Sequence, residues 1–246
     1  MNEMIENIKQ MRAVTISREY GSGGGEIASR LAKRLGWQLL DHALIERVAS
    51  ELATSQEEAE VHDEHVEGAL TRALTNMQYL YPAGLANLPP EAFLSDEAYW
   101  KTMNRVIKTA VGRDHTVIVG RGAQVLLADR PDILHVRIIA PLGQRVSYVM
   151  QREAVNQATA ASRIHRKDHE RARYLEAEYH RKPEDASLYD LVLKTSFLDF
   201  DSAVALICLA LHSKARRLAA GPNETQPAEE WLRYPGPLLD FHPSAN

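Results

Sequence analysis

Short runs of aliphatic and β-branched residues alternate along the chain with longer stretches in which apolar residues recur every three or four positions. The short runs predict strands at residues 13–17, 37–40, 116–119, 133–140 and 189–194. The longer stretches predict helices at residues 26–35, 43–52, about 96–111, 142–156 and 202–218. Strands that alternate with helices favour right-handed crossovers, so we expect an α/β fold with a five-stranded parallel sheet and helices on both faces.

Three segments depart from this alternation. Residues 54–80 have sparse apolar positions and are expected to be helical and polar, and residues 81–95 are a loop rich in proline and glycine. Residues 159–181 are strongly charged and also expected to be helical. We therefore predict one domain over residues 12–220, followed by a proline-rich tail over residues 221–246.

The tail is unusual because it carries large apolar side chains among its prolines. Disordered segments have low hydrophobicity, so we expect the tail to dock on a folded surface. That surface belongs either to its own domain or to a second copy, and the latter arrangement would make the protein a homodimer. The large apolar residues are Trp231, Leu232, Tyr234, Leu238, Leu239 and Phe241.

Composition excludes several classes of function. The chain has 246 residues and a formal net charge of −4, so no bulk positive field attracts nucleic acid or an anionic membrane. The single cysteine, Cys208, lies in an apolar run, which indicates a core position and suits a reducing, cytoplasmic compartment. Residues 1–11 are charged and lack the apolar core of a signal peptide. No set of metal-ligating residues is expected.

A glycine-rich loop between the first strand and the first helix carries the strongest functional signal. Glycines let backbone N–H groups converge on an oxyanion, and a helix N-terminus adds partial positive charge. The order strand, glycine loop, helix is the context in which such a loop binds phosphate. We expect the donor phosphates of a nucleotide to be held by Gly21, Ser22, Gly23, Gly24, Gly25 and Glu26.

This loop differs from the P-loop pattern G-x-x-x-x-G-K-[ST]. Gly24 stands at the lysine position and Gly25 at the hydroxyl position, so the charge must come from elsewhere. Arg18 is the nearest candidate, with a surface ion pair to Glu19 as its alternative role. A dinucleotide-binding loop is a second alternative, because Asp41 follows at about the required distance, although the sixth-position glycine of that motif is absent.

The segment SREYGSGGGEIASRLAKRLGWQLLDHALI resembles the cytidylate kinase-like family, which is related to the nucleoside monophosphate kinases. In that family a loop without the lysine is the usual form. The resemblance covers about residues 12–215 and implies a P-loop kinase-type, three-layer α/β/α fold. It further implies a helical insertion on the acceptor side at residues 54–113 and a lid at residues 159–182.

The resemblance also implies roles for individual residues. The motif D-G-R-D-I-G of true cytidylate kinases falls on residues 119–123, where Arg121 matches the arginine that holds the acceptor phosphate and neither aspartate is present. The lid motif R-x-R-D-S-x-R is matched in part by Arg166, Asp168 and Arg171, and the resemblance implies that the two arginines close over the ATP phosphates. Asp41 ends the second strand and either holds the acceptor or caps the following helix.

These observations predict a kinase that transfers the ATP γ-phosphoryl group to a nucleoside monophosphate, CMP or dCMP, with Mg²⁺ bridging the phosphates. Arg18, Arg166 and Arg171 would supply the catalytic positive charge. Two alternatives remain. One is a kinase of another small-molecule acceptor on the same fold. The other is a non-catalytic nucleotide-binding regulator, because the lysine, the hydroxyl and the aspartates are all missing.

Overall fold

The computed structural model describes residues 8–41 and 96–224. The predicted helix at 43–52, the polar segment at 54–80 and the loop at 81–95 lie outside the described residues. So do residues 1–7 and residues 225–246, which include all the large apolar residues of the predicted tail.

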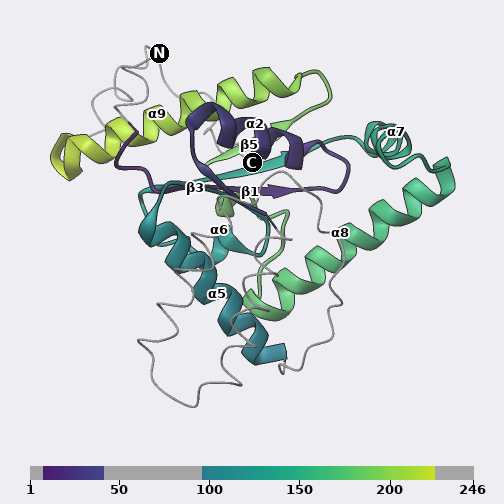
Figure 1. The fold of residues 1–246 in the computed structure, drawn as a ribbon, viewed down its shortest axis with the longest axis horizontal. Helices are drawn as coiled ribbons and strands as arrows, with labels where there is room; N and C mark the ends of the chain where they lie inside the picture. The colour runs from purple at the N-terminus through teal and green to yellow at the C-terminus, as the bar shows by residue number, and fades with distance from the viewer. Residues whose placement is uncertain (1–7, 42–95, 225–246) are drawn as a thin grey trace, which may run out of the picture.

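Five parallel strands form the central sheet, as the alternating pattern predicted (Figure 1). Their order across the sheet is β2-β3-β1-β4-β5, so β1 lies at the centre with β3 and β4 hydrogen-bonded to its two edges. In this arrangement the carboxyl ends of all five strands meet at one edge, where α/β folds bind ligands. The strands are β1 (Ala13–Arg18), β2 (Gln38–Leu40), β3 (Thr116–Val119), β4 (Ile133–Ile139) and β5 (Leu191–Lys194).

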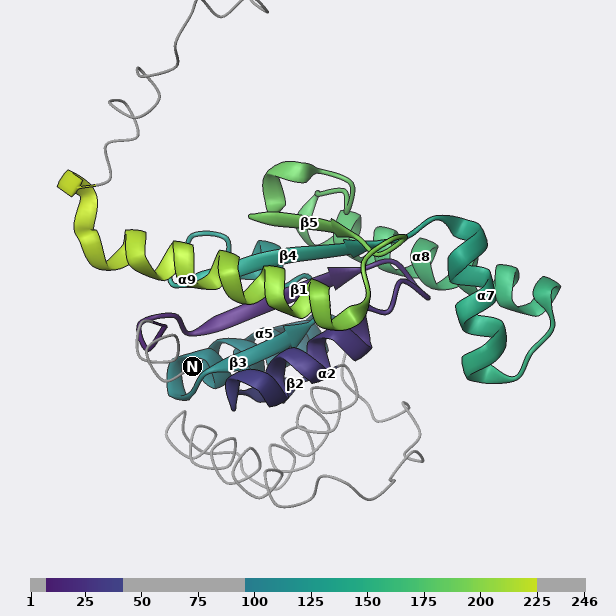
Figure 2. The ribbon, with the colours of Figure 1, turned by 90° about the horizontal axis from the view of Figure 1, so that it is seen from above.

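Helices cover both faces of the sheet and complete the three expected layers. Helices α2 (Gly24–Leu35) and α9 (Phe200–Glu224) lie on one face, and α5 (Asp96–Arg113) and α6 (Ala123–Leu126) on the other (Figures 1 and 2). Helix α9 continues to Glu224, four residues into the segment predicted as tail. The remaining helices are α7 (Leu142–Glu153), α8 (Gln157–Tyr179) and the short 3₁₀ helix η1 (Ala186–Leu188).

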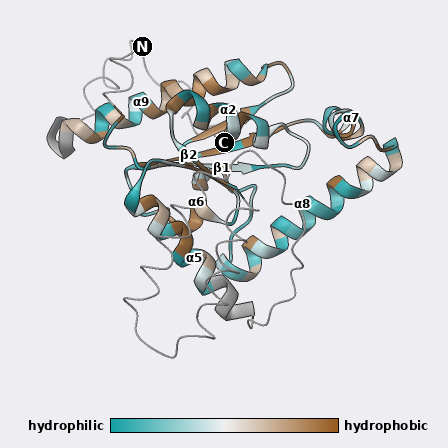
Figure 3. Cartoon of the chain, in the orientation of Figure 1, coloured by the Kyte–Doolittle hydropathy of each residue, from teal (hydrophilic) through white to brown (hydrophobic). Residues whose placement is uncertain are grey.

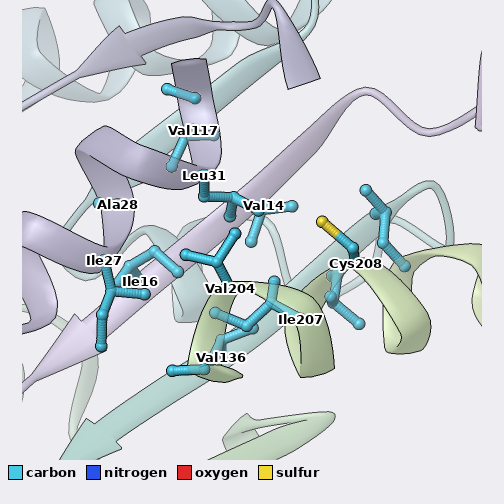
Figure 4. Close-up of a cluster of buried hydrophobic side chains, with 14 of the residues drawn as sticks. Val14, Ile16, Ile27, Ala28, Leu31, Val117, Val136, Val204, Ile207 and Cys208 are labelled. Atoms are coloured by element: carbon cyan, nitrogen blue, oxygen red, sulfur yellow. The ribbon is translucent and has the colours of Figure 1, made fainter. Parts of the chain in front are cut away.

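The main core lies between the sheet and the pair α2 and α9 (Figure 4). Ile27 and Leu31, one helical turn apart on α2, are fully buried against Val14 and Ile16 of β1. Each such side chain contributes about 1.5–3 kcal/mol when it leaves water. Cys208 of α9 is 3% exposed within this core, as predicted, and burial raises the pKa of its thiol.

Helix α8 differs from the others because most of its surface is polar (Figure 3). Its buried residues are Ala160, Ile164 and Leu175, and the first two pack on Val146 and Val149 of α7. Helices α7 and α8 therefore form a separate small unit beside the carboxyl edge of the sheet (Figure 1). None of the helices in the described ranges combines the length and the apolar composition that a membrane span requires.

Candidate functional site

Residues 19–23 join the end of β1 to the start of α2, and the glycine loop, residues 21–26, includes the first three residues of α2. Gly21 and Gly23 both adopt left-handed backbone angles with φ of +80°, a conformation that glycine reaches without strain. Gly23 caps α2, and no side chain caps it. The first N–H groups of a helix have no acceptor inside the helix, so the first turn of α2 presents free donors and a positive dipole end.

Close packing explains why most of these positions exclude a side chain. A Cβ atom on Gly23 would lie 2.4 Å from Cε1 of Phe200, and one on Gly24 would lie 2.6 Å from Cβ of Arg18. Gly25 has open space instead. The loop is therefore held at fixed places by its neighbours while its outer surface at Gly25 stays open.

A cavity of about 540 Å³, here called the larger cavity, lies over the glycine loop. It is lined by the loop glycines together with Arg18, Asp41 and Arg171, so the structure brings these predicted site residues together. Tyr148, Arg152 and Glu153 of α7 form another part of the wall. Ser22 does not line it, because its hydroxyl donates to the backbone oxygen of Glu19 at 2.9 Å and holds the loop from inside.

A second cavity of about 170 Å³, here called the smaller cavity, lies on the other side of Arg18. Arg18, Glu19 and Arg171 line both cavities, so the two cavities meet at two arginines and one carboxylate. Arg121, predicted to hold an acceptor phosphate, lines the smaller cavity. Other lining residues come from β4, α8 and the connection between α8 and β5: Arg137, Asp168, Tyr174, Pro183 and Glu184.

The turn between β3 and α6 has an unusual backbone. Gly120, Arg121 and Gly122 all have positive φ angles, of 78°, 58° and 64°. A Cβ atom on Gly120 would lie 1.9 Å from Nη1 of Arg18, so the missing side chain makes room for that guanidinium. Arg121 is not a glycine, and its left-handed conformation costs about 1 kcal/mol. The Tyr174 hydroxyl donates to the Arg121 carbonyl at 3.4 Å.

Positive charge is in excess where the cavities meet. Burial, then the charges of Arg171 and Arg121, lower the pKa of Arg18 from its ordinary value to about 9, and Asp41 opposes this shift. Burial likewise lowers the pKa of Arg171. At neutral pH both guanidiniums are still protonated, so the folded protein holds repelling cations together. An anion bound between them would relieve this repulsion.

Asp168 fastens α8 to the segment before the glycine loop. Its carboxylate accepts the Tyr20 backbone N–H at 2.7 Å and pairs with Arg145 at 2.5 Å. Arg171, one turn further on, donates to the backbone oxygen of Arg18 at 3.3 Å and lies over the Tyr20 ring at 5.4 Å. Asp168 also lies 3.5 Å from Nη1 of Arg171 and so helps to position that guanidinium at the site.

The structure does not bring Arg166 to the site. Its side chain is 65% exposed, pairs with Glu170 at 3.7 Å along α8, and lines neither cavity. Glu26 lines the larger cavity but bonds Arg30 at 2.9 Å, one helical turn away.

Glu19 has partners other than Arg18, the residue with which the sequence suggested an ion pair. Its carboxylate accepts the Ala140 N–H at 2.9 Å and lies 3.6 Å from Arg145. The proposed cap that Asp41 makes for the next helix lies outside the described residues.

Two buried arginines at the site were not singled out from the sequence. Arg145 of α7 bonds Asp168 and the Tyr20 carbonyl, and Arg137 of β4 lines the smaller cavity. The signal for Arg137 was a charged residue inside a buried strand in which His135 is the other polar residue. Among the described residues no three His, Cys, Asp or Glu side chains are grouped as ligands for a metal ion.

Comparison with known proteins identifies the family. The sequence model of the cytidylate kinase-like family matches residues 13–197, which is most of the chain. The chain belongs to this family. A crystal structure of an uncharacterized protein from Eubacterium ventriosum has the same fold, with a TM-score of 0.60 and 23% identity, and the match covers 82% of this chain and 98% of that one.

Two further proteins are similar to this chain. Shikimate kinase from Acinetobacter baumannii, in complex with shikimate, aligns over 88% of this chain and 95% of its own, with 12% identity and a TM-score of 0.40. A uronate isomerase from Corynebacterium glutamicum is 32% identical over 94 residues, which is 38% of this chain. The chain spans only 18% of the length of that curated relative.

Proposed function

We propose that this cytidylate kinase-like protein transfers the γ-phosphoryl group of ATP to a nucleoside monophosphate, with CMP and dCMP as the favoured acceptors. Family membership supports a small-molecule phosphotransferase in general. The observation that carries the proposal is the pair of cavities of unequal size that share Arg18, Arg171 and Glu19, whose carboxylate is paired with Arg145. A phosphoryl transfer between two bound molecules needs such a shared, positively charged boundary.

The larger cavity suits the donor. Its volume of about 540 Å³ lies within the range of small-molecule sites. The glycine loop offers backbone N–H groups and a helix N-terminus to the phosphates, and Arg18 supplies the charge that lysine supplies in other P-loop kinases. Mg²⁺, when bound, would neutralise part of the phosphate charge, and Asp41, a carboxylate in the wall of this cavity, would hold it or its waters.

The smaller cavity suits the phosphate of the acceptor. Arg121 lines it in a left-handed conformation that a glycine would adopt without strain, and strained residues gather at functional sites because the side chain is used. A guanidinium forks onto two oxygens of a phosphate. An acceptor phosphate at Arg121 would then face the donor across Arg18.

The reaction asks little of the protein beyond placement and charge. An oxygen of the acceptor phosphate attacks the γ-phosphorus, the bond from that phosphorus to the β–γ bridging oxygen breaks, and ADP leaves. A phosphate dianion needs no general base. Arg18 and Arg171 stabilise the charge that spreads over the transferring group, an interaction typically worth a hundred- to a thousandfold in rate.

A panel of acceptors tests this proposal. ATP and Mg²⁺ are supplied with CMP, dCMP, UMP, AMP, GMP or a small hydroxy acid, and ADP release is followed. We expect CMP or dCMP to react fastest. Fastest turnover of a hydroxy acid would favour a kinase of another acceptor. Tight ATP binding without turnover of any acceptor would favour the regulator, in agreement with the glycines that replace the lysine and the hydroxyl.

A further inference from the structure

A buried arginine inside the central sheet is the starting point. Arg137 is 7% exposed, and its neighbours in β4, Val136 and Ile138, are fully buried. In the parallel register it stands opposite Ser17 of β1, at the carboxyl end of the sheet. Removing a charged guanidinium from water costs several kcal/mol unless strong partners replace the water.

Among the described residues, Arg137 has only long polar contacts. Its Nη1 lies 3.4 Å from the Ser17 hydroxyl and 3.3 Å from the Tyr189 hydroxyl, and its Nη2 lies 3.9 Å from the Glu184 carboxylate. Glu184 is itself 73% exposed. Charge-assisted hydrogen bonds of arginine are normally about 2.7–2.9 Å long, so none of these contacts is a strong one.

Arg145 provides the contrast within the same molecule. Its side chain is 11% exposed, against 9% for Arg137, yet it bonds the Asp168 carboxylate at 2.5 Å and the Tyr20 carbonyl at 3.2 Å. The fold therefore supplies a carboxylate to the buried arginine that fastens its helices together. Within residues 8–41 and 96–224 it supplies no comparable acceptor to Arg137.

The position of Arg137 shows where an acceptor would arrive. Arg137 lines the smaller cavity together with Arg121, Arg18 and Arg171. Three carboxylates, Glu19, Asp168 and Glu184, line the cavity with these four arginines. Glu19 and Asp168 each accept a backbone N–H and pair with Arg145, and Asp168 also lies 3.5 Å from Arg171. Positive charge is therefore in excess in a cavity of about 170 Å³.

Tyr189 holds the guanidinium of Arg137 in place. The Tyr189 hydroxyl donates to the Pro183 carbonyl at 2.9 Å, which leaves its oxygen to accept from Arg137. The Tyr189 ring centre lies 5.6 Å from the guanidinium carbon. A side chain fixed in this way loses little further entropy when a ligand binds.

We infer that Arg137 is a second ligand for the anionic group in the smaller cavity, acting with Arg121, and that this group is a phosphate dianion. This inference rests on the proposed function, because it takes the smaller cavity as the acceptor site. Two guanidiniums match the two charges and several oxygens of a phosphate monoester better than they match one carboxylate. Arg137 thereby selects phosphorylated acceptors over carboxylic acids.

Binding of CMP, cytidine and ATP to three variants tests the inference by calorimetry. Arg137→Met removes the charge at similar length, Arg137→Lys keeps the charge without the fork, and Arg173→Met is the control. Arg173 is exposed on α8 and lines neither cavity. Arg137→Met should weaken CMP binding at least tenfold and Arg137→Lys less, while cytidine and ATP change by less than twofold.

A double-mutant cycle with Arg121→Ala separates a phosphate ligand from a structural residue. If both arginines hold one phosphate, their losses in CMP affinity are not additive, because either change already disrupts the shared contact. Arg137→Met should also raise the KM for CMP more than it lowers kcat. CMP binding within twofold of wild type, or equal losses for CMP and ATP with a lower melting temperature, would overturn the inference.

Inorganic phosphate distinguishes failure of this inference from failure of the proposed function. If no acceptor is phosphorylated but phosphate stabilises the wild type against heat and stabilises Arg137→Met less, the anion site stands without the kinase. If Arg137→Met phosphorylates CMP with the wild-type KM, the kinase stands and Arg137 is not a ligand. If Arg137→Met does not fold, the same measurements of binding, KM and phosphate stabilisation are made on Arg137→Lys.

Discussion

The two cavities that meet at Arg18 differ in the kind of hydrogen-bond donor that lines them. The larger cavity offers mainly backbone donors, the N–H groups of the glycine loop and the first turn of α2. The smaller cavity offers side-chain donors, chiefly Arg121 and Arg137. A backbone donor is kept by every residue except proline, whereas a side-chain donor is lost when that one residue is exchanged.

The backbones at the two cavities differ in the same way. Gly23 holds a left-handed conformation at no steric cost, while Arg121 holds one at a cost of about 1 kcal/mol. The larger cavity thus keeps glycines where shape matters, and the smaller cavity keeps a charged residue where glycine would fit better. Substitutions should therefore act through shape at the first cavity and through charge at the second.

The largest expected effect is Gly23→Ala. A Cβ atom there lies 2.4 Å from Phe200, and the residue keeps a φ of +80°, so strain and overpacking together should lower the free energy of unfolding by about 3 kcal/mol. Urea denaturation measures this. Gly112→Ala on α5, where a Cβ meets nothing within 4 Å, should lose no stability. Wild-type stability of Gly23→Ala would contradict the shape argument.

Arg121→Ala should produce the next largest effect, on binding rather than stability. Loss of a bidentate charged contact should weaken CMP binding by about 2–3 kcal/mol and leave ATP binding nearly unchanged. Calorimetry with each ligand in turn measures both affinities. An equal loss for ATP and CMP would mean that the two cavities are not separate sites.

Helix α8 should respond to the donor. It carries Arg171 at the boundary and has only three buried residues, the composition of a segment that opens locally. ATP should therefore slow amide hydrogen exchange in α8 about tenfold, equivalent to about 1.4 kcal/mol. Exchange that stays the same at saturating ATP would rule out a lid role for residues 159–182.

A smaller effect separates the side chain of Arg121 from its backbone. Arg121→Ala and Arg121→Gly remove the same contacts, but alanine keeps the left-handed penalty at φ +58° and glycine does not. The free energy of unfolding of Arg121→Gly should therefore be about 1 kcal/mol higher than that of Arg121→Ala. Equal melting of the two variants would show that the turn is unstrained.

The smallest effect is on the stability of the protein at low pH, and it comes from Glu153 in the wall of the larger cavity. Hydrogen bonds from Tyr20 and Arg163 lower the pKa of the Glu153 carboxyl. Its stabilisation is therefore complete above the unfolded pKa of about 4.3 and is lost as the pH falls through the lower folded value.

Glu153→Gln should remove part of the pH dependence of unfolding below about pH 4.5. The change should be under about 1 kcal/mol, because the Glu153 side chain is partly exposed. Urea denaturation between pH 3 and 6 measures it. A variant with the same pH dependence as the wild type would mean that the contact with Tyr20 contributes nothing.

The fold was predictable because its three central strands, β1, β3 and β4, are buried and its helix α2 is amphipathic. The predicted strand at 133–140 differs from β4 by one residue, and the predicted helix at 26–35 begins two residues inside α2. Helix α6 was not predicted, because four residues contain no complete period. Its start depends on the turn at Gly122, which is a tertiary feature.

The site was predictable only where a local motif carries it. The glycine loop and Arg121 follow from sequence order, whereas Arg137 meets the smaller cavity through the register of β4 against β1. Helical geometry explains the different fates of the two lid arginines. Arg166 and Arg171 are five residues apart, or about 140° around the helix axis, so only one of them faces the site.

Transfer of labelled phosphate tests the central claim most directly. The protein is given ATP labelled in the γ-phosphoryl group, Mg²⁺ and CMP, and wild type is compared with Arg18→Met. We predict that the label moves to CDP, and that Arg18→Met loses at least a hundredfold in rate while its melting temperature without ligand is equal or higher, because a repelling cation is gone. Label that stays in ATP or passes to water, or an Arg18→Met variant as fast as the wild type, would contradict a phosphoryl transfer site shared at Arg18.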